Sequence, residues 1–538
     1  MKHKINIKEK NISFWLTRIW FVACVIIMAV FMKNNLWHLY TDDMSAEMIL
    51  GHDIASGHHL FFSGDWHYAT ELRVINSQLV YALLFRVFNN WATVRYLGLI
   101  ILYAAVVVPM YFMFKLFDNL DCFYAVAGVM AIPFTHFYYD IVLVGNFYST
   151  NIMFVFLVFV LLIYLSNPKR KETKKLYIVV LYAMLFGCSF ITGIGGVRHL
   201  LILFVPALIG GLFAFLFYVK NGDRMEHKSP LDNSYFKFVV LTLISTIVFF
   251  VGYKINSDLL SWMYGSRVYD FMKLQRIDID RVVYAFQSFF EYFGYVEEVD
   301  LFTFTGICGA ISILMVALVI MAFISLIKNR DRLSYAENLY VLFALFSQVV
   351  FLLVFTFTDS PYVPWYNEPF AIFILPVLGI YVKHMLQPKY IKWCAAILMC
   401  GCMAVLGFNQ YQELANRFPA AIDEKVEIAD FLVSEDYLNG YSTFTHAPQM
   451  VEISNNRIDM WQIEDGAQTV GDIYKWLELE YHEQTTPDGK VFFLVEKSQK
   501  DTVIPYTYLT DANKIYETDS FFVFGFDSYE LMPQEMKP

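Results

Sequence analysis

Two adjacent carboxylates, Asp42 and Asp43, stand directly after the first long apolar segment of the chain. They open a polar stretch that continues through Glu71 and Arg73. Carboxylates at the boundary between membrane and water can act as a general base or hold a cation, and the large loop behind them could shape a pocket over the lipid surface. The alternative interpretation of the same pair is a solvated loop end.

The composition places this pair in a membrane protein. Of the 538 residues, 57% are hydrophobic and 17% are charged, and the mean hydropathy is +0.47. This composition is too apolar for an ordinary soluble protein. Runs of membrane-spanning length predict a polytopic α-helical membrane protein with about eleven transmembrane helices, over residues 14–32, 96–117, 122–139, 147–165, 176–192, 200–219, 238–253, 301–327, 339–357, 370–382 and 391–408.

A further run over residues 74–88 is interrupted by polar residues, and we expect it to form a helix along the membrane surface. The distribution of Lys and Arg then agrees with one orientation, in which five basic clusters lie in the cytoplasm. The loops 33–95 and 254–300 and the chain after residue 408 lie outside. We therefore expect a multi-pass protein of the cell membrane with a cytoplasmic N-terminus, whose first segment is a retained signal anchor.

Residues 1–408 form the predicted membrane domain, and residues 409–538 form a second domain with a different composition. The second domain holds 24 Asp and Glu against 9 Lys and Arg, a net charge of −15, whereas the whole chain carries −10. Its acidity argues against a nucleic-acid partner. We expect an extracytoplasmic α/β domain with helices near 424–437 and 469–481, strands near 441–445, 450–463 and 491–495, closing strands up to Phe526, and turns at Asn439-Gly440 and Pro487-Asp488-Gly489.

Several apolar or aromatic features have structural explanations that compete with functional ones. The cluster Gly193-Ile194-Gly195-Gly196 is more typical of a tight turn or close packing than of a phosphate-binding loop. Trp461, Trp476 and Tyr441 could stack on a sugar, but they are also expected core residues. The loop 254–300 alternates apolar and charged residues and predicts amphipathic helices, which could cap a lipid groove or simply cover the bundle.

The aspartate pair belongs to a series of residues with a recognisable order along the chain, Thr41-Asp42-Asp43-Met44-Ser45-Ala46-Glu47-Met48, Gly51, Ala55, Gly57, Thr70-Glu71-Leu72-Arg73, Trp91 and Val94-Arg95. This series resembles the GT-C superfamily of membrane glycosyltransferases, and most of all the branch of protein O-mannosyltransferases and aminoarabinose transferases acting on lipid A. In that branch an acidic pair follows the first span, a basic residue precedes the interfacial helices, and an Arg starts the second span.

The resemblance implies transfer of a sugar from a polyprenyl-phosphate-linked donor to a glycan, lipid or protein acceptor outside the membrane. An inverting transfer needs one carboxylate to remove the acceptor's hydroxyl proton and a cation to stabilise the departing phosphate. The resemblance assigns the base to Asp42 or Asp43, with Asp42 preferred. Membrane lipids are the other expected partners.

Three arginines, Arg73, Arg95 and Arg198, are the candidates for binding the donor phosphate, because guanidinium stays charged and contacts two phosphate oxygens at once. The alternative for each is an arginine that snorkels to the lipid headgroups. The candidates for shaping the substrate site are Glu71, His67 and Tyr366.

No cofactor is certain from the sequence. The first loop holds His52, His58, His59 and His67, but their spacing is not that of a metal site. A divalent cation on Asp42 and Asp43 is left open.

Two other functions remain open at this stage. A lipid or glycan transporter or flippase usually carries ionisable residues in mid-membrane, whereas the predicted spans are nearly free of central charge. A non-catalytic cell-envelope assembly protein would make Asp42 and Asp43 dispensable. Loss of sugar transfer on Asp42→Asn or Asp43→Asn would separate the enzyme from both alternatives.

Overall fold

The computed structural model of the chain describes residues 2–36, 40–57, 59–69, 72, 74–135, 138–139, 143, 148–167, 174–220, 233–260, 273–360, 366–386, 389–416 and 419–538. The chain divides into two compact units. The membrane unit comprises Met1–Phe31, Leu102–Ser257 and Asp270–Glu413. The loop-and-tail unit comprises Met32–Ile101, Asp258–Tyr269 and Leu414–Pro538.

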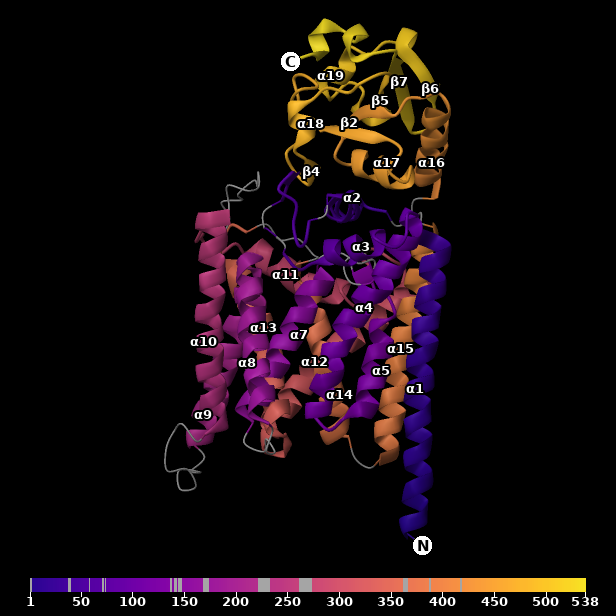
Figure 1. Cartoon of the computed structure of the whole chain (residues 1–538). Helices are drawn as coiled ribbons and strands as arrows, with labels where there is room; N and C mark the ends of the chain where they lie inside the picture. The colour runs from indigo at the N-terminus through magenta and orange to yellow at the C-terminus, as the bar shows by residue number, and fades with distance from the viewer. Residues whose placement is uncertain are drawn as a thin grey trace. The chain divides into compact units, whose positions relative to one another are not determined.

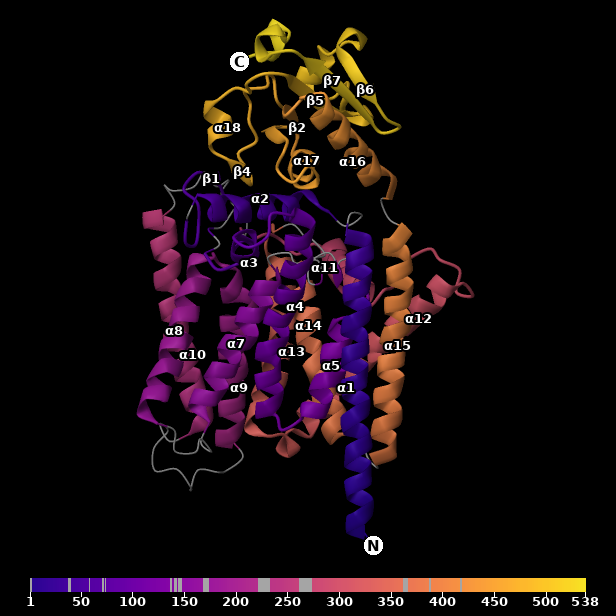
Figure 2. The same cartoon turned by 45° about the vertical axis from the view of Figure 1, so that its right-hand side comes forward.

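The membrane unit is built from helices that run side by side (Figures 1 and 2). Three of its helices also contribute residues to the other unit, namely α1 (Lys2–Asn35), α4 (Trp91–Leu116) and α15 (Lys389–Asn416). The others are α5 (Leu120–Met130), α7 (Tyr148–Ser166), α8 (Lys175–Ile194), the π-helical η3 (Leu200–Phe204) leading into α9 (Val205–Lys220), α10 (Ser234–Ile255), α11 (Ile279–Glu291), α12 (Phe304–Lys328), α13 (Tyr335–Phe357) and α14 (Glu368–His384).

Within the described residues, nine helices are long and apolar enough to cross a membrane, and two more are apolar but shorter. These eleven helices correspond in order to the eleven predicted spans. The shorter two are α5 and a helix over Pro369–His384 within α14. The prediction of a helical membrane protein is therefore confirmed.

The predicted span over residues 122–139 was wrong in length, because α5 ends at Met130 after 11 residues. The amides of Ala131 and Ile132 bond to carbonyls only three residues back, which tightens the end of the helix. Pro133 follows, and it has no amide hydrogen with which to continue the helix.

Helices α8 and α10 pack closely through glycine. A Cβ at Gly193 would lie 2.0 Å from the carbonyl oxygen of Phe249, and a Cβ at Gly252 would lie 2.2 Å from that of Phe190. Neither position has room for a side chain. This geometry confirms the packing interpretation of the cluster around Gly193.

A buried ionic cluster joins the start of α13 to the end of α14. The carboxylate of Glu337 is fully buried and lies 2.9 Å from Lys383 Nζ and 3.0 Å from His384 Nε2. Lys383 Nζ also donates to the carbonyl of Phe117, at 2.6 Å. Glu337 completes a capping box with Ser334, so one carboxylate both starts α13 and holds α14 in place.

We expect Glu337→Ala to lower the free energy of unfolding by about 2–4 kcal/mol, because it leaves the Lys383 ammonium without its carboxylate and removes the capping box. The measurement is chemical unfolding of the full-length protein in micelles. Asp331→Ala is the matched control, since Asp331 is exposed and precedes the same helix. Equal effects of the two substitutions would contradict a special role for Glu337.

The first part of the loop-and-tail unit holds α2 (Asp42–Ser56), the short strand β1 (Trp66–His67) and α3 (Ser77–Phe85). The nine residues of α3 span roughly 13 Å, far less than a bilayer core of about 30 Å. The predicted non-spanning helix between residues 74 and 88 is thus confirmed as a short helix. Its orientation along the membrane surface stays a prediction.

Tyr81 is the residue around which α2, α3 and α4 meet. A Cβ at Gly51 of α2 would lie 2.7 Å from Tyr81 Cβ, and a Cβ at Gly98 of α4 would lie 2.4 Å from the Tyr81 ring. Two glycines therefore let α2 and α4 contact one buried tyrosine of α3. This packing holds α2, which carries the aspartate pair, at a defined place.

The tail of the same unit forms a five-stranded mixed sheet in the order β3-β2-β5-β7-β6. β2 pairs in parallel with β3 and β5, and the last two pairings are antiparallel. The elements in chain order are α16 (Pro419–Ser434), β2 (Asn439–Thr443), α17 (Ala447–Ile453), β3 (Asp459–Ile463), β4 (Glu478–Leu479), α18 (Tyr481–Gln484), β5 (Val491–Glu496), α19 (Ile504–Thr507), β6 (Lys514–Glu517) and β7 (Phe521–Phe526).

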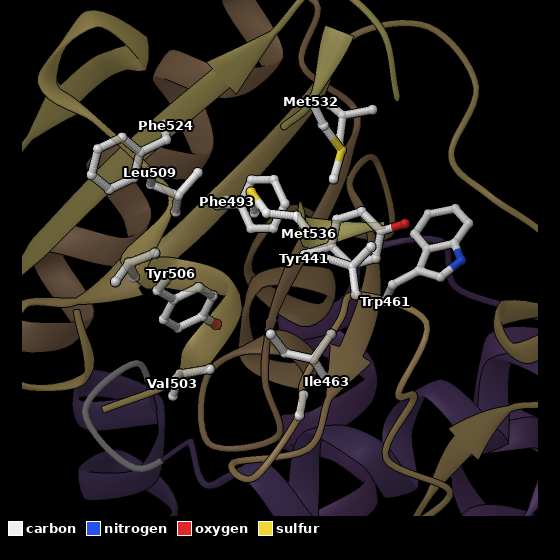
Figure 3. Packing of buried hydrophobic residues seen from close by; sticks show 14 of the residues in the cluster. Tyr441, Trp461, Ile463, Phe493, Val503, Tyr506, Leu509, Phe524, Met532 and Met536 are labelled. Atoms are coloured by element: carbon white, nitrogen blue, oxygen red, sulfur yellow. The ribbon is translucent and has the colours of Figure 1, made fainter. Parts of the chain in front are cut away.

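An aromatic core packs against one face of this sheet (Figure 3). The Tyr441 ring stacks on Phe493 with a centroid distance of 5.2 Å, and it lies 6.1 Å from the Trp461 ring. Tyr441 and Trp461 are both almost fully buried. Their interpretation as core residues, in preference to sugar-stacking residues, is confirmed.

Three details of the predicted tail were wrong, and the first two lie between residues 439 and 463. Residues 450–463 are not one strand, because α17 runs to Ile453 and β3 begins only at Asp459. Pro448 in the first turn favours this helix. Asn439-Gly440 is not a turn but the start of β2, where a Cβ on Gly440 would lie 2.4 Å from the Phe492 ring.

The predicted helix over residues 469–481 is replaced by turns, β4 and the start of α18. Asp472 accepts hydrogen bonds from the amides of Gln468 and Thr469, and such side-chain bonds compete with helix formation. The amide of Tyr474 donates to the carbonyl of Gln462 in β3, which draws the segment along the sheet. Strand β5 and the closing strands β6 and β7 agree with the prediction.

Helix α11 confirms one of the amphipathic helices expected between residues 254 and 300. Its apolar side chains Ile279, Val283 and Phe286 are exposed and follow helical spacing. Arg281 donates to the carbonyls of Phe355 and Ser360, which fixes the helix against the end of α13. Residues 261–272 of this loop lie outside the described residues.

Candidate functional site

Helix α2 starts at the aspartate pair. Thr41 Oγ1 accepts a hydrogen bond from the Met44 amide, and Asp42 Oδ1 accepts one from the Asp43 amide at 2.9 Å. Acidic residues in a first turn also interact favourably with the helix dipole. The pair therefore has a local structural role at the start of α2, in addition to any catalytic role.

The environment of Asp42 favours a basic carboxylate. Its side chain is half-buried, and burial raises the pKa of Asp42 above its ordinary value. Backbone hydrogen bonds and the positive charge of Lys425 act in the opposite direction on the same pKa. A carboxylate with a raised pKa holds a proton more readily, which suits a general base.

Lys425 of α16 is a candidate functional residue that was not predicted from the sequence. It is 4% exposed, and its Nζ donates to Gln449 Oε1 at 2.5 Å and lies 3.0 Å from His446 Nδ1. Burial lowers the pKa of Lys425 to about 8, although Asp42 and Glu496 act to raise it. The side-chain Nε2 of Gln449 donates to the carbonyl of Tyr40 at 3.4 Å, which links this cluster to the chain just before Asp42.

Arg95 forms a fully buried ion pair with Glu452 of α17. Arg95 Nε and Nη2 each lie 2.5 Å from a different oxygen of the Glu452 carboxylate, and neither side chain is exposed. The Tyr40 ring lies 4.7 Å from the guanidinium carbon. Nε and Nη2 of Arg95 thus already bind a carboxylate, whereas its buried Nη1 has no hydrogen-bond partner among the described residues.

The Glu452 carboxylate also binds the first loop. Ser45 of α2 donates to Glu452 Oε2 at 2.7 Å, and the Trp91 amide at the start of α4 donates to Asn455 Oδ1 at 2.9 Å. The buried Glu452 carboxylate and the nearby Asn455 side chain thus join α2 and α4 to α17 and the residues that follow it. A lone charge in the apolar run Met450-Val451-Glu452-Ile453 is a sequence signal that could have indicated such a buried pair.

Two of the predicted site residues lie together in the membrane unit. The guanidinium of Arg198 lies 4.6 Å from the ring centroid of Tyr148 and 5.5 Å from that of Tyr366. Arg198 precedes the π-helical segment η3, and short π-helical segments are frequent at functional sites. The structure therefore connects the predicted phosphate residue Arg198 with the predicted substrate-shaping residue Tyr366.

His67 lies in β1, which pairs with β4 of the tail. Its Nε2 is 3.4 Å from the Glu483 carboxylate. Burial lowers the pKa of His67, while Glu483 and Glu480 act to raise it. His67 is thus part of the junction between the first loop and the tail.

The remaining predicted site residues are placed as follows. Glu71 and Arg73 lie outside the described residues, and Asp43 is half-buried in the first turn of α2. Within the residues that the structure does describe, no group of three or more His, Cys, Asp or Glu side chains could hold a metal ion. A divalent cation on Asp42 and Asp43 stays a prediction.

His482 of α18 lies between two carboxylates of the tail. Its Nδ1 contacts Glu478, and its Nε2 lies 3.1 Å from Asp459 Oδ1. Burial alone would lower the pKa of His482, but the two carboxylates outweigh burial and raise it to about 9 from its ordinary 6.5. The imidazolium therefore stabilises the fold fully below pH 6.5, and this stabilisation is lost as the pH rises through 9.

We expect the melting temperature of the full-length protein to fall by several degrees between pH 6.5 and 9, since one unit of pKa shift is worth about 1.4 kcal/mol. His482→Gln should flatten this slope, because the group that titrates is removed. His59→Gln, which alters a histidine outside the cluster, should leave it unchanged. A slope that is equal in all three proteins would refute the assignment to His482.

The comparisons with known proteins bear on the fold. No family model matches the sequence, and no sequence of a curated protein matches it either. Two solved structures of ArnT from Cupriavidus metallidurans do match the structure. The one bound to undecaprenyl phosphate has a TM-score of 0.56 at 10% identity and covers 95% of this chain and 98% of that chain.

The apo structure of the same ArnT gives a TM-score of 0.55 at 12% identity and covers 96% of this chain and 98% of that chain. ArnT is a GT-C glycosyltransferase. This chain has the GT-C fold. It is also a multi-pass membrane protein.

The GT-C likeness extends beyond the bundle of helices, because the matched part includes nearly the whole chain. An oligosaccharyltransferase of Archaeoglobus fulgidus is similar over 97% of this chain and 75% of its own, at 11% identity. Its TM-score is 0.47, which is too low to add to the argument. The resemblance to the GT-C superfamily inferred from the residues around Asp42 is thereby confirmed at the level of the fold.

Proposed function

We propose that this protein is a glycosyltransferase that moves a sugar from a polyprenyl-phosphate-linked donor to an acceptor on the outer side of the cell membrane. The observation that carries the proposal is the half-buried Asp42 carboxylate, with its raised pKa, in a chain with the GT-C fold. The undecaprenyl phosphate bound to the ArnT neighbour supports a polyprenyl-linked donor. The basic clusters of the sequence support the outer side.

In the proposed reaction, an acceptor hydroxyl oxygen attacks the anomeric carbon of the donor sugar. Asp42 takes the hydroxyl proton, the bond between that carbon and the phosphate oxygen breaks, and polyprenyl phosphate leaves with the bonding electrons. One displacement of this kind inverts the anomeric configuration. Asp42 is the proposed base because its environment raises its pKa, and Asp43 is the second candidate.

The departing phosphate needs a cation, and Arg198 is our first candidate. The rings of Tyr148 and Tyr366 contact its guanidinium at 4.6 and 5.5 Å. Aromatic rings use the faces of a guanidinium, whereas phosphate oxygens use its N–H edge, so both contacts can be made together. Arg73 is the second candidate, and Tyr366 is proposed to shape the site around Arg198.

Arg95 is proposed to act at a distance from the reacting atoms. Its pair with Glu452 holds α4 and α17 together, and Ser45 on the same carboxylate ties in α2. We therefore assign Arg95 a positioning role for the helix that carries Asp42. Glu71 and His67 remain candidates for shaping the substrate site from the first loop.

A proteoliposome experiment separates the transferase from the transporter. Full-length protein is reconstituted and given undecaprenyl-phosphate donors carrying radiolabelled sugars, with a cell-envelope extract as the source of acceptor. The proposal requires label to leave the donor lipid. Movement of intact donor between leaflets, without cleavage, would instead support a flippase and overturn the proposal.

A further inference from the structure

A small pocket of the loop-and-tail unit lies apart from Asp42 and is not used in the proposed reaction. Trp66 of β1 forms one wall, and Asp459 and Gln462 of β3 form another. Glu478 of β4 and His482 of α18 complete the polar lining. The cavity volume is about 20 Å³, which is room for a group the size of a water molecule or of one hydroxyl.

Two buried polar atoms of this lining lack a hydrogen-bond partner within the described part of the chain. They are Trp66 Nε1, a donor, and Gln462 Oε1, an acceptor, and each residue is only 2% exposed. Gln462 Nε2 donates to the carbonyl of Leu477 at 3.3 Å, which fixes the orientation of its amide. An unpaired buried polar group costs about 1–3 kcal/mol, so two in one pocket indicate a missing partner.

The charged groups of the pocket are already paired with one another. His482 bonds to Glu478 through Nδ1 and to Asp459 through Nε2, and the Tyr481 hydroxyl bonds to the second oxygen of Asp459. One imidazolium between two carboxylates leaves a net charge of −1, which disfavours an anionic ligand, and each of these charged groups already has a partner. The atoms of the lining that still lack a hydrogen-bond partner among the described residues are therefore one neutral donor and one neutral acceptor.

A hydroxyl group meets both requirements at once, because it accepts a hydrogen bond and donates another. A sugar ring presents such hydroxyls beside C–H groups that can lie against apolar walls. The pocket offers an indole ring at Trp66 and aliphatic side chains at Ile49 and Pro448. A sugar hydroxyl thus fits the chemistry of the lining better than an anion or a purely apolar group.

We propose that this pocket binds one sugar residue of a glycan through a hydroxyl that accepts from Trp66 Nε1 and donates to Gln462 Oε1. This inference rests on the proposed function in one respect, since it makes the acceptor a glycan. The pocket is built jointly by the first loop and the tail, because Trp66 pairs with Leu479 and His67 with Glu478. The tail then has a role in recognising the acceptor.

The test uses saturation-transfer difference NMR on the full-length protein in micelles. The probes are methyl glycosides of glucose, galactose, mannose and N-acetylglucosamine at millimolar concentration. Trp66→Phe removes the indole N–H and keeps an aromatic ring, and Gln462→Leu removes the amide. The controls are Trp476→Phe and Gln468→Leu, which change the same residue types outside the pocket.

At least one glycoside should bind the wild type, and each pocket variant should weaken its Kd about threefold to tenfold, the loss expected for one hydrogen bond. The two controls should bind like the wild type. Thermal unfolding of each variant ensures that only folded proteins are compared. Absence of binding by all four glycosides, or equal binding by pocket variants and controls, would show that the pocket holds water only.

The failures of the two proposals are distinguishable. If the protein cleaves a polyprenyl-linked donor but binds no glycoside, the pocket assignment falls and the transferase stands. If glycosides bind through Trp66 and Gln462 but no donor is cleaved, the transferase falls and a sugar-binding pocket remains.

Discussion

Glu452→Ala should lower the free energy of unfolding by about 3–5 kcal/mol, the cost of leaving a buried charge without its partner. The Arg95 guanidinium is fully buried, and Glu452 supplies both of its carboxylate contacts at 2.5 Å. The same substitution removes the acceptor of the Ser45 hydroxyl. Chemical unfolding of the full-length protein in micelles measures the loss.

The double variant Arg95→Met with Glu452→Leu provides a sharper test. Replacing both partners of a buried pair by apolar residues is often nearly neutral, so the double variant should be more stable than either single variant. Glu530→Ala is the control, because Glu530 is exposed in the same tail. Losses that simply add in the double variant would contradict a direct pair between Arg95 and Glu452.

Asp42→Asn should reduce sugar transfer by about 100-fold to 10,000-fold, the usual contribution of a general base. The substitution removes the basic carboxylate but keeps the helix start, because asparagine retains the Oδ1 atom that accepts a hydrogen bond from the Asp43 amide. Helix α2 should therefore start as before. The measurement is the initial rate of label transfer by variants with unchanged unfolding curves.

Asp43→Asn is the matched comparison for Asp42→Asn. Both residues stand in the first turn of α2, so a merely structural role at the helix start would give similar small effects. We expect Asp43→Asn to retain activity within about tenfold of the wild type, whereas Asp42→Asn does not. Full activity of Asp42→Asn would remove Asp42 from the reaction, and an effect confined to Asp43→Asn would transfer the role of base to it.

The helices of the membrane unit were predictable because a span of about 20 apolar residues is a local signal. Every predicted run corresponds to an apolar helix, and most boundaries agree within about five residues. The main error was the run over residues 122–139, where composition alone was followed past Pro133. The short α5 shows that one proline can outweigh an apolar stretch of spanning length.

The tail was less predictable because its local signals are weak and depend on distant partners. Strand β5 is apolar throughout and was found, whereas α17 is short and apolar enough to resemble a strand. The segment 469–481 has helical spacing, but the bond of Tyr474 to Gln462 and the turn at Asp472 hold it along the sheet. Such bonds join residues that no local window contains.

The site shows the same division between local and distant information. The aspartate pair could be found from its place after the first span, and the structure adds burial, which raises the pKa of Asp42. The partner of Arg95 could not be found, since Glu452 is 357 residues away in the chain. Lys425 was missed for the same reason, because its burial beside Gln449 exists only in the folded unit.

Mass spectrometry of the donor lipid most directly tests the central claim that this GT-C protein consumes a polyprenyl-phosphate sugar. Proteoliposomes with wild type or Asp42→Asn are incubated with undecaprenyl-phosphate sugars and envelope extract, and the lipids are then extracted. We predict that wild type releases one undecaprenyl phosphate for each sugar transferred and that Asp42→Asn releases almost none. Donors that stay intact with the folded wild-type protein, or equal release by both proteins, would contradict the account.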